Sequence, residues 1–558
     1  MSAVGSSMRR LPRPSLRLPV LVKDLTEQAA QRRTYIIRFV YGLVLFTSSV
    51  GLFYANLGVR ATARQTLGRG ATYFAILLTF QIVAMYLVIP LLTAGAIAAE
   101  RQRETLVLLI LSPLTPWQIV LQKYLSRMAP VLTFVFLSFP LLAITYTFGG
   151  VTVAELLLGI VVLIFVCLEL GAFGIMCSAW CTTTAGALGA TYVGSLLFPW
   201  FCSGVCCTLP AAGLWGADYV SHVAAIVAVG FCVFSTAACL TIAESVLGRV
   251  SATANRNVPP LFRLIDRFFE ALNLRAGGVV LWRDRPGLPA GEPIRWRETR
   301  KRSFGTLRYL IRILLVMELP VLVLAPAIRL RADPAIQDRG ILLLLGLAWM
   351  SAILLVAVFA ASVVSQERSR QTLIALLTCP LSGRHILEQK LAGVDRLMAV
   401  LAVPLLSLIL FECWWHWPVS ATYLLLSALM LVVYFPCVKW LAAGLGLRMR
   451  TQLLAVVVTT CVLVVWIAGT SLALPVLNRL HVETSAIRET MFVLSPIDVL
   501  RSTQRTALDA ADQIPNSSLL QYRPFALHFA CYAGLWFLLR QGCLRNLDRR
   551  LGRVPQPG

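Results

Sequence analysis

Long apolar runs, separated by short polar or charged segments, dominate the chain from residue 35 to residue 540. Each run is close to the ~20 residues that a helix needs to cross the hydrocarbon core of a bilayer. The pattern predicts an all-α polytopic membrane protein with about twelve transmembrane helices in two sets of six. The first set is predicted at residues 35–57, 71–98, 127–148, 153–179, 185–208 and 219–245, and the second at residues 309–330, 341–364, 394–411, 419–446, 453–474 and 524–540.

Two charged stretches occupy the same place in each set, between its second and third spans. Residues 100–123 read ERQRETLVLLILSPLTPWQIVLQK, and residues 367–390 read ERSRQTLIALLTCPLSGRHILEQK. They align without a gap at an offset of 267 residues and are identical at 11 of 24 positions. Two unrelated apolar segments would not agree this well. We therefore interpret the chain as an internal duplication.

The composition agrees with a membrane protein and explains the high net charge. Hydrophobic residues make up 58% of the chain and charged residues only 14%, against about 25% charged in soluble domains. The net charge of +24 comes from basic residues between the spans and at the ends, as the positive-inside rule expects for cytoplasmic segments. This placement argues against a nucleic-acid partner.

The charge distribution also predicts the domain organisation. Residues 247–308 carry 13 Arg and Lys against five acids, so we expect this linker in the cytoplasm, together with both termini and both charged stretches. We place the protein in the plasma (inner) membrane. The predicted parts are a tail with an interfacial helix at 1–34, a first six-span repeat at 35–245, a basic linker at 246–308, a second six-span repeat at 309–540 and a tail at 541–558.

Each charged stretch has the sequence of a helix, a break and a capped helix. We expect its charged first turn to face water and Leu106 and Leu109 to face the interior. Pro113 and its counterpart Pro380 stop the first helix, because proline cannot continue the backbone hydrogen bonds. Thr115 and Ser382 then suit an N-cap, which predicts a short second helix ahead of the next span.

These residues resemble the cytoplasmic loop of the ABC type-2 exporter permeases, whose pattern is roughly E-R-x-x-x-T-L-x-x-L-x-x-(S/T)-P-(L/V)-(S/T), followed by an apolar residue and a Lys. Cys379 takes the Ser position in the second copy, and Glu104 and Gln371 stand where the family often has Gly. Leu494-Ser495-Pro496, ahead of the last span, is also similar to the family's sequence. The positions that fit are Glu100, Arg101, Thr105, Leu106, Leu109, Ser112, Pro113, Leu114, Thr115 and Lys123, and Glu367, Arg368, Thr372, Leu373, Leu376, Thr378, Pro380, Leu381, Ser382 and Lys390.

The resemblance implies a transport subunit that works with a separate ATPase. In such permeases the loop is a coupling helix that fits a groove of a stand-alone ABC ATPase subunit, and ATP hydrolysis there drives alternating access and export. By implication this chain meets two ATPase copies, with ATP and Mg bound by the partner and no cofactor bound by the chain itself. The coupling-loop residues that the resemblance implies are Glu100, Arg101, Arg103, Thr105, Pro113, Thr115, Lys123, Glu367, Arg368, Arg370, Thr372, Pro380, Ser382 and Lys390.

The residues also argue against activity of the chain by itself. A phosphate-binding P-loop needs Gly followed by Lys, and none of the five lysines follows a glycine, so we expect no ATPase and no other enzyme in this chain. The five histidines lack metal-ligand spacing, so no metal site is expected. We expect the charges at the start of each stretch to hold the loop against neighbouring spans, and the capped segments to contact the ATPase.

Two other functions remain compatible with the sequence. An ion-coupled secondary carrier with parallel repeats needs ionisable groups inside the membrane, and Glu169 and Glu318 are the candidates. Each of them either contacts substrate or pairs with a neighbour, and they do not occupy matching positions in the two sets. A non-transporting membrane assembly protein would share the spans but would not need two docking loops. The outer segment 475–523 could form a cap or a re-entrant helix.

Overall fold

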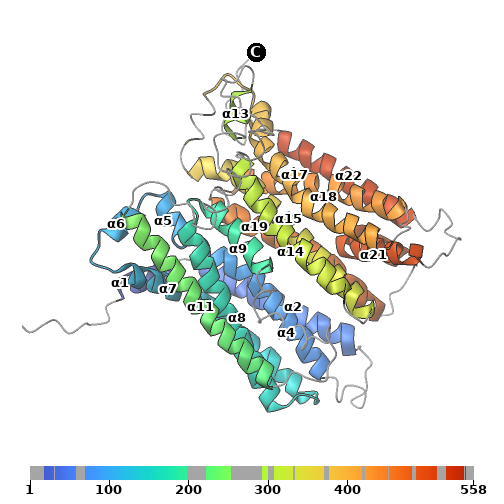
Figure 1. Ribbon diagram of the computed structural model, residues 1–558, viewed down its shortest axis with the longest axis horizontal. Coiled ribbons are helices and arrows are strands. Elements are labelled where there is room, and N and C mark those ends of the chain that lie inside the picture. The colour runs from blue at the N-terminus through green and yellow to red at the C-terminus, as the bar shows by residue number, and fades with distance from the viewer. Residues whose placement is uncertain are drawn as a thin grey trace, which may run out of the picture.

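The computed structural model describes residues 18–30, 32–57, 70–197, 222–252, 292–298, 307–330, 334–369, 372, 376, 378–416, 421–449, 451–479, 485–511, 523–545 and 547. Within these residues the chain forms helices and no strand. The long helices lie side by side and run in one general direction through the molecule (Figure 1). Seven helices in the described part are long and apolar enough to cross a membrane.

We call the described residues up to 252 the first half and those from 292 onward the second half. The first half contains α1 (Pro19–Ala30), α2 (Arg32–Leu57), α4 (Gly70–Thr93), α5 (Ala98–Gln102), α6 (Leu106–Ile110), α7 (Pro116–Thr147), α8 (Val153–Trp180), α9 (Thr184–Leu197) and α11 (His222–Ala252). The second half contains α13 (Pro293–Trp296), α14 (Leu307–Arg329), α15 (Pro334–Ser369), α17 (Gly383–Trp415), α18 (Ala421–Arg448), α19 (Gln452–Arg479), α20 (Ser485–Leu494), α21 (Pro496–Ala511) and α22 (Arg523–Leu544).

One helix in each half lies at the centre of that half. In the first half α8 packs against α4, α7, α9 and α11, and in the second half α18 packs against α15, α17, α19 and α22. The halves meet where α9 packs on α15 and where α2 packs on α19. One hydrophobic core cluster contains buried side chains from both halves, including Tyr192 and Leu355, so the two halves form one packed body.

Close helix packing in the second half depends on a glycine. A Cβ atom added to Gly446 of α18 would lie 2.4 Å from the carbonyl oxygen of Ala361 in α15. Small residues at such crossings let two backbones approach within the membrane. Gly446 therefore sets the distance between α15 and α18.

Residues 485–511 form two helices, α20 and α21, with a buried turn between them. Ser495, at the turn, is 0% exposed, and its hydroxyl accepts a hydrogen bond from the backbone N–H of Asp498, which caps α21. The last carbonyl oxygens of α20 accept hydrogen bonds from groups on α22: the hydroxyl of Tyr532 donates to Leu494 at 2.9 Å, and Nδ1 of His528 lies 2.7 Å from the oxygen of Val493.

These contacts place the turn inside the bundle, and we interpret α20 and α21 as a re-entrant pair. Tyr532 lies more than two turns from the start of α22, and the Nε2 atom of His528 also contacts the hydroxyl of Tyr434, near the middle of α18. A broken helix at this depth requires partners for its free carbonyl groups, because lipid supplies none. Figure 1 shows α21 at the end of the bundle opposite α5 and α13.

The structure corrects one expectation from the sequence. No separate short helix follows Thr115, because α7 runs without interruption from Pro116 to Thr147. Thr115 does cap its first turn through the predicted capping box with Gln118. No residue between 116 and 127 ends the helix, so the cap starts the span itself. Ser382 caps α17 in the same way, by accepting from the N–H of His385.

Several predicted segments lie outside the described residues. They are the N-terminal tail to residue 17, residues 198–208 of the fifth predicted span, the linker apart from 246–252, 292–298 and 307–308, and the C-terminal tail at residue 546 and after residue 547.

We expect Tyr532→Phe to destabilise the protein, because it removes the hydroxyl that donates to the carbonyl oxygen of Leu494 at the end of α20. A typical intramolecular hydrogen bond contributes about 0.5–1.5 kcal/mol. The control Tyr146→Phe changes a side chain that is 50% exposed, and it should shift the unfolding free energy by less than about 0.5 kcal/mol. Chemical unfolding in detergent measures both variants, and equal stability of the two would show that this hydrogen bond does not hold the re-entrant turn.

Candidate functional site

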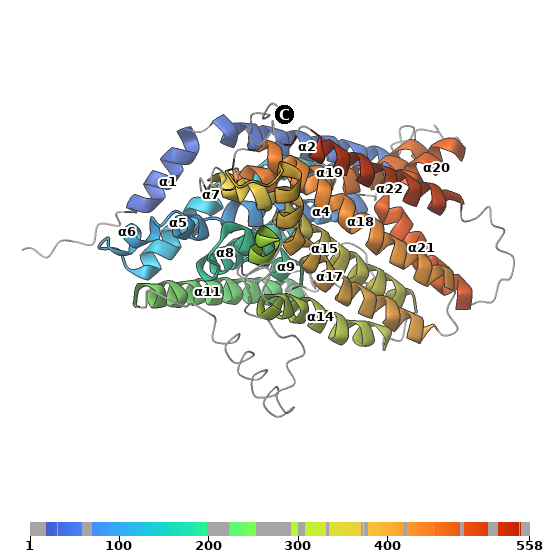
Figure 2. The same cartoon turned by 90° about the horizontal axis from the view of Figure 1, so that it is seen from above.

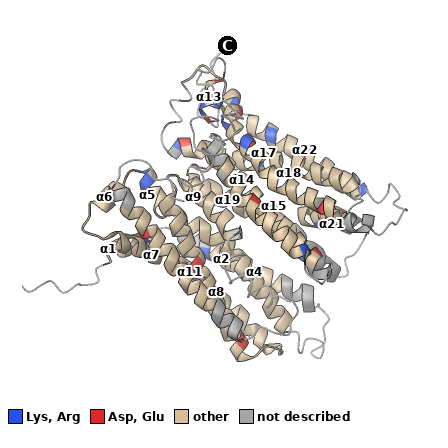
Figure 3. Cartoon of the chain, viewed as in Figure 1, with Lys and Arg blue, Asp and Glu red and all other residues tan. Residues whose placement is uncertain are grey.

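The two related stretches lie at the same end of the bundle, opposite α21. The first comprises α5, α6 and the start of α7, and the second comprises the end of α15 and the start of α17, next to α13 (Figures 1 and 2). Charged residues gather around α5, α13 and the neighbouring end of α17, while the long helices are mostly uncharged (Figure 3). The described residues thus bring the charges of both stretches together with parts of the chain that lie ahead of the first span of each half.

A buried lysine lies between two carboxylates in the first half. Nζ of Lys123, a residue that is 4% exposed, donates to Asp24 at 3.1 and 3.3 Å and to Glu100 at 3.3 Å. The hydroxyl of Thr105 donates to the other oxygen of Glu100, and the hydroxyl of Ser126 donates to Asp24 at 3.2 Å. This unit joins α1, α5, the residue before α6, and α7.

The second half contains the same arrangement. Nζ of Lys390, a residue that is 3% exposed, donates to Glu367 at 2.8 Å and to Glu298 at 3.1 Å. The hydroxyl of Thr372 again donates to the second oxygen of Glu367. Gly393, which replaces Ser126 at the 267-residue offset, lies beside the backbone and Cβ of Glu298 and leaves room for the longer side chain.

The burial of these groups corrects part of the expectation that the charged turn faces water. Glu367 is 1% exposed and Lys390 3%, and Glu100 is only partly accessible, whereas Arg103 and Glu104 of the first turn are exposed as expected. The lysine attracts both carboxylates inward, so the two glutamates form the polar core of the loops. A buried pair that loses one partner costs far more than a surface pair, because the remaining charge stays desolvated. These charges therefore fix the position of each loop.

The arginine that follows each glutamate holds the loop to the next pair of spans. Arg101 donates to two carbonyl oxygens at the end of α8, at 2.9 and 3.3 Å. Arg368 donates to two carbonyl oxygens at the end of α18, at 2.9 and 3.3 Å. The last carbonyls of a helix have no partner within it, and a cation is favoured there by the helix dipole. The four acceptors are Ala179, Cys181, Leu447 and Met449.

A helix ahead of the first span of each half, α1 or α13, is bound by the glutamine that precedes the buried lysine. Oε1 of the buried Gln122 accepts from the backbone N–H groups of Val20, at 2.9 Å, and Leu21, at 3.3 Å, at the start of α1. Oε1 of the buried Gln389 accepts from the N–H of Arg295 at 3.4 Å in α13. Each glutamine thus satisfies N–H groups at a helix start, which have no partner within the helix.

The two segments that supply Asp24 and Glu298 have a similar pattern of residue types, which the sequence analysis missed. Residues 19–24 read PVLVKD and residues 293–298 read PIRWRE, at a constant offset of 274. Both have Pro, then a β-branched residue, and end in a basic residue followed by an acid. The second segment lies in the linker, which the sequence analysis interpreted only through its high net charge. A search for the pattern around Asp24 would have found Glu298.

The tip of the first loop exposes an apolar surface. Leu106 is buried, whereas Val107 is 60% exposed, Leu108 70% and Leu111 76%. Pro113 and Pro380 are exposed too, and end the turns ahead of α7 and α17. We call Val107, Leu108 and Leu111 the apolar tip. Arg103 is exposed beside it, and its counterpart Arg370 lies outside the described residues.

Glu104 adopts a backbone conformation that favours glycine. Its φ angle is 62°, in the left-handed region that glycine adopts without strain. The turn between α5 and α6 requires this conformation, so that Thr105 can reach back to Glu100.

The two intramembrane glutamates are not brought together. Glu169 lies in α8 and Glu318 in α14, in different halves, and no hydrogen bond or ion pair of the described residues joins them. Each has one carboxylate oxygen that is buried without a hydrogen-bond partner in the described part of the chain.

A second polar cluster, which the sequence analysis did not identify, lies at the opposite end of the second half. Arg329 donates to Glu412 at 3.2 and 2.5 Å and to Asp338 at 2.8 Å. Gln504 of α21 donates to Glu412 at 2.9 Å and accepts from the hydroxyl of Tyr423 at 3.4 Å. The cluster ties the re-entrant helix to α14, α15, α17 and α18.

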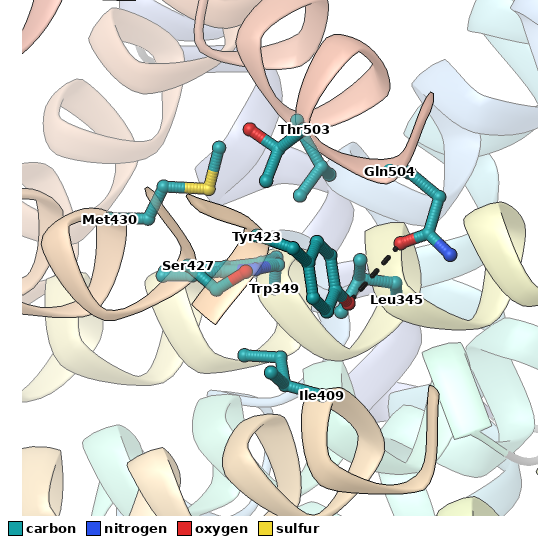
Figure 4. A pocket seen from close by; sticks show the side chains of 9 residues that line it. Leu345, Trp349, Ile409, Tyr423, Ser427, Met430, Thr503 and Gln504 are labelled. Carbon is teal, nitrogen blue, oxygen red and sulfur yellow. Dashed lines mark hydrogen bonds between the residues drawn. The ribbon is translucent and has the colours of Figure 1, made fainter. Parts of the chain in front are cut away.

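A cavity beside this cluster is too small for a substrate. The ring of Tyr423 and the side chains of Trp349, Met430 and Thr503 surround it, and Gln504 meets the Tyr423 hydroxyl at its edge (Figure 4). Its volume is about 10 Å³, which is room for about one water molecule. We interpret the cluster and the cavity as part of the packing of the re-entrant helices.

The fold and these sites define the chain as an all-α, multi-pass membrane protein. No protein-family model matches its sequence, and no curated protein matches it.

We expect Lys390→Met to lower the free energy of unfolding by about 3–5 kcal/mol, because it leaves two buried carboxylates without their cation. The control is Lys439→Met, which removes a pair with Asp395, a side chain that is 50% exposed. That change should cost no more than about 1 kcal/mol. Chemical unfolding in detergent compares them, and a similar loss in both variants would contradict a special role for Lys390.

We expect Glu104→Gly to stabilise the loop relative to Glu104→Ala. Alanine keeps the strain of the left-handed conformation, which costs roughly 1–2 kcal/mol, whereas glycine removes it. Thermal unfolding of the two variants measures the difference. A higher melting temperature for the alanine variant would show that the left-handed turn is not retained in solution.

Proposed function

We propose that this chain is the membrane-spanning permease subunit of an ATP-binding-cassette exporter, with two six-helix repeats fused in one polypeptide. A separate ATPase subunit docks on each of the two loops, at residues 100–123 and 367–390, and hydrolyses ATP to drive alternating access. The chain itself binds no ATP. On this proposal the loops, the linker and both termini are cytoplasmic, and the protein resides in the plasma membrane.

The observation that carries the proposal is the recurrence of a complete loop support. The Lys–Glu–acid unit, the Thr hydrogen bond, the Arg contact with helix-end carbonyls and the Gln contact with a preceding helix all occur twice. An ordinary connector between spans needs no such support, because loops tolerate change. A loop that passes force to the membrane helices needs a fixed position on them.

The apolar tip is the surface that we assign to ATPase contact in the first half. Three exposed apolar side chains lie at the end of a loop whose base is fixed by buried charges. Isolated exposed apolar residues need no explanation, but such a group on a rigid projection suits a groove on a partner. We assign the contact to α6 and the residue after it, ahead of Pro113, with the capped start of α7 as support.

The carrier alternative has less support from the structure. A coupling site shared by two parallel repeats would place ionisable groups at matching positions, and Glu169 and Glu318 lie on helices that do not correspond, α8 and α14. A membrane assembly protein without transport would leave the doubled loop support without a purpose.

The test is whether an ATPase binds through the apolar tip. We expect the wild-type chain, purified from its native membrane, to carry a subunit with a Walker A sequence that is labelled by a photoreactive ATP analogue. The double variant Leu108→Asp/Leu111→Asp should lose at least tenfold of this subunit, because burial of a leucine contributes about 1.5–3 kcal/mol and tenfold corresponds to about 1.4 kcal/mol.

Leu330→Asp is the matched control, since Leu330 is 80% exposed and lies at the end of α14, away from the loops. It should keep the ATPase. Absence of any ATP-labelled subunit from the wild-type preparation, or full retention by the tip variant, would overturn the docking proposal. ATP hydrolysis by the chain after removal of every such subunit would overturn the division of labour.

A further inference from the structure

Residues next to the first docking loop also form a polar contact between the two halves. Oε1 of Gln102, the last residue of α5, accepts from the backbone N–H of Thr184 at 3.3 Å and lies 3.1 Å from its hydroxyl. The hydroxyl of Thr184 also lies 2.9 Å from Oε1 of Gln452 in the second half. Gln102 directly follows Arg101, so only one residue separates this contact from Glu100 of the loop support.

The contact joins the starts of two corresponding helices. Thr184 is the first residue of α9 and Gln452 the first residue of α19, and they differ by 268 positions, close to the offset of the loops. The first N–H groups of a helix have no partner within it and carry a partial positive charge. The glutamine oxygens lie between two such helix starts, which would otherwise repel each other.

The contact is also one that can open. A neutral hydroxyl–amide hydrogen bond contributes only about 0.5–1.5 kcal/mol, because opening it exchanges the bond for bonds to water. The hydroxyl of Thr184 has a single proton, so it can donate to only one of the two glutamine oxygens. By contrast, the lysine units that hold each loop contain several charge-assisted bonds and remain intact more readily.

We infer that Gln102, Thr184 and Gln452 form a latch that closes the loop end of the interface between the halves, and that the first docking loop controls it through Gln102. A shift of the loop moves Gln102, which withdraws the acceptor from the start of α9 and separates Thr184 from Gln452. That this shift is driven by an ATPase rests on the proposed function. The latch is then the point where loop movement becomes separation of the halves.

A short thiol cross-link across the latch tests the inference in the full-length chain. Thr184→Cys and Gln452→Cys are combined with Cys181→Ser, which removes the native thiol three positions from residue 184, and the 184–452 cross-link formed by a bifunctional thiol reagent of side-chain length in native membranes is measured by peptide mass spectrometry. We expect efficient cross-linking in the absence of nucleotide, and none in either single-cysteine variant. Failure of the pair to cross-link under these conditions would overturn the latch.

The role of Gln102 is tested in the same background. Gln102→Ala removes the acceptor from the start of α9 and should lower the cross-linking rate roughly fivefold, the change in equilibrium that one net hydrogen bond makes. Gln102→Glu keeps the acceptor oxygens and should retain the rate. Equal rates in the alanine, glutamate and parental chains would show that the loop does not control the contact.

A third measurement separates this inference from the proposed function. With the ATPase bound and trapped with ATP in a hydrolysis-deficient form, the cross-linking rate should fall, and Gln102→Ala should abolish the dependence on ATP. A bound ATPase with an unchanged rate would overturn the latch while leaving docking intact. If no ATPase binds, the proposed function and its control of the latch are overturned, while the first two measurements still decide the contact itself.

Discussion

The arrangement of both loops depends on a lysine that is buried between two carboxylates. The low polarity around Lys123 and Lys390 makes separation of these charges costly, so each lysine keeps its two acids in place. One acid comes from the loop and the other from a helix ahead of the first span of that half. A single cation therefore fixes three pieces of chain that are distant in sequence, and the arginine and glutamine contacts then orient the loop on the ends of neighbouring helices.

The same principle, partners for polar groups where lipid offers none, explains the opposite end of the second half. The re-entrant turn exists because His528 and Tyr532 reach the free carbonyls of α20. The cluster around Arg329 and Glu412 then holds α21 against the bundle. At this end Arg329 pairs with two carboxylates, whereas the loop end exposes the apolar tip and joins the halves through neutral hydrogen bonds. The difference suits a molecule whose movable contacts lie at the loop end.

The sequence by itself determined the class of the protein and the position of the loops. Apolar runs of span length require helices in a bilayer, because every backbone polar group must be satisfied within the segment. The aligned stretches identified Glu100, Lys123, Glu367 and Lys390 from their spacing alone, and Thr115 and Ser382 as helix caps. Local signals of this kind are encoded within a few residues, so they can be read without knowledge of the fold.

Tertiary structure alone decided which groups these residues meet. The sequence analysis placed the whole charged turn in water, but the fold turns Glu100 and Glu367 inward, because Asp24 and Glu298 come from segments 99 and 92 positions away from the lysines. The expected short helix is the first part of α7, since a cap fixes where a helix begins and not where it ends. The contact between Thr184 and Gln452 spans 268 positions. Such pairings follow from the packing of whole helices against one another, so they cannot be predicted from a local sequence pattern.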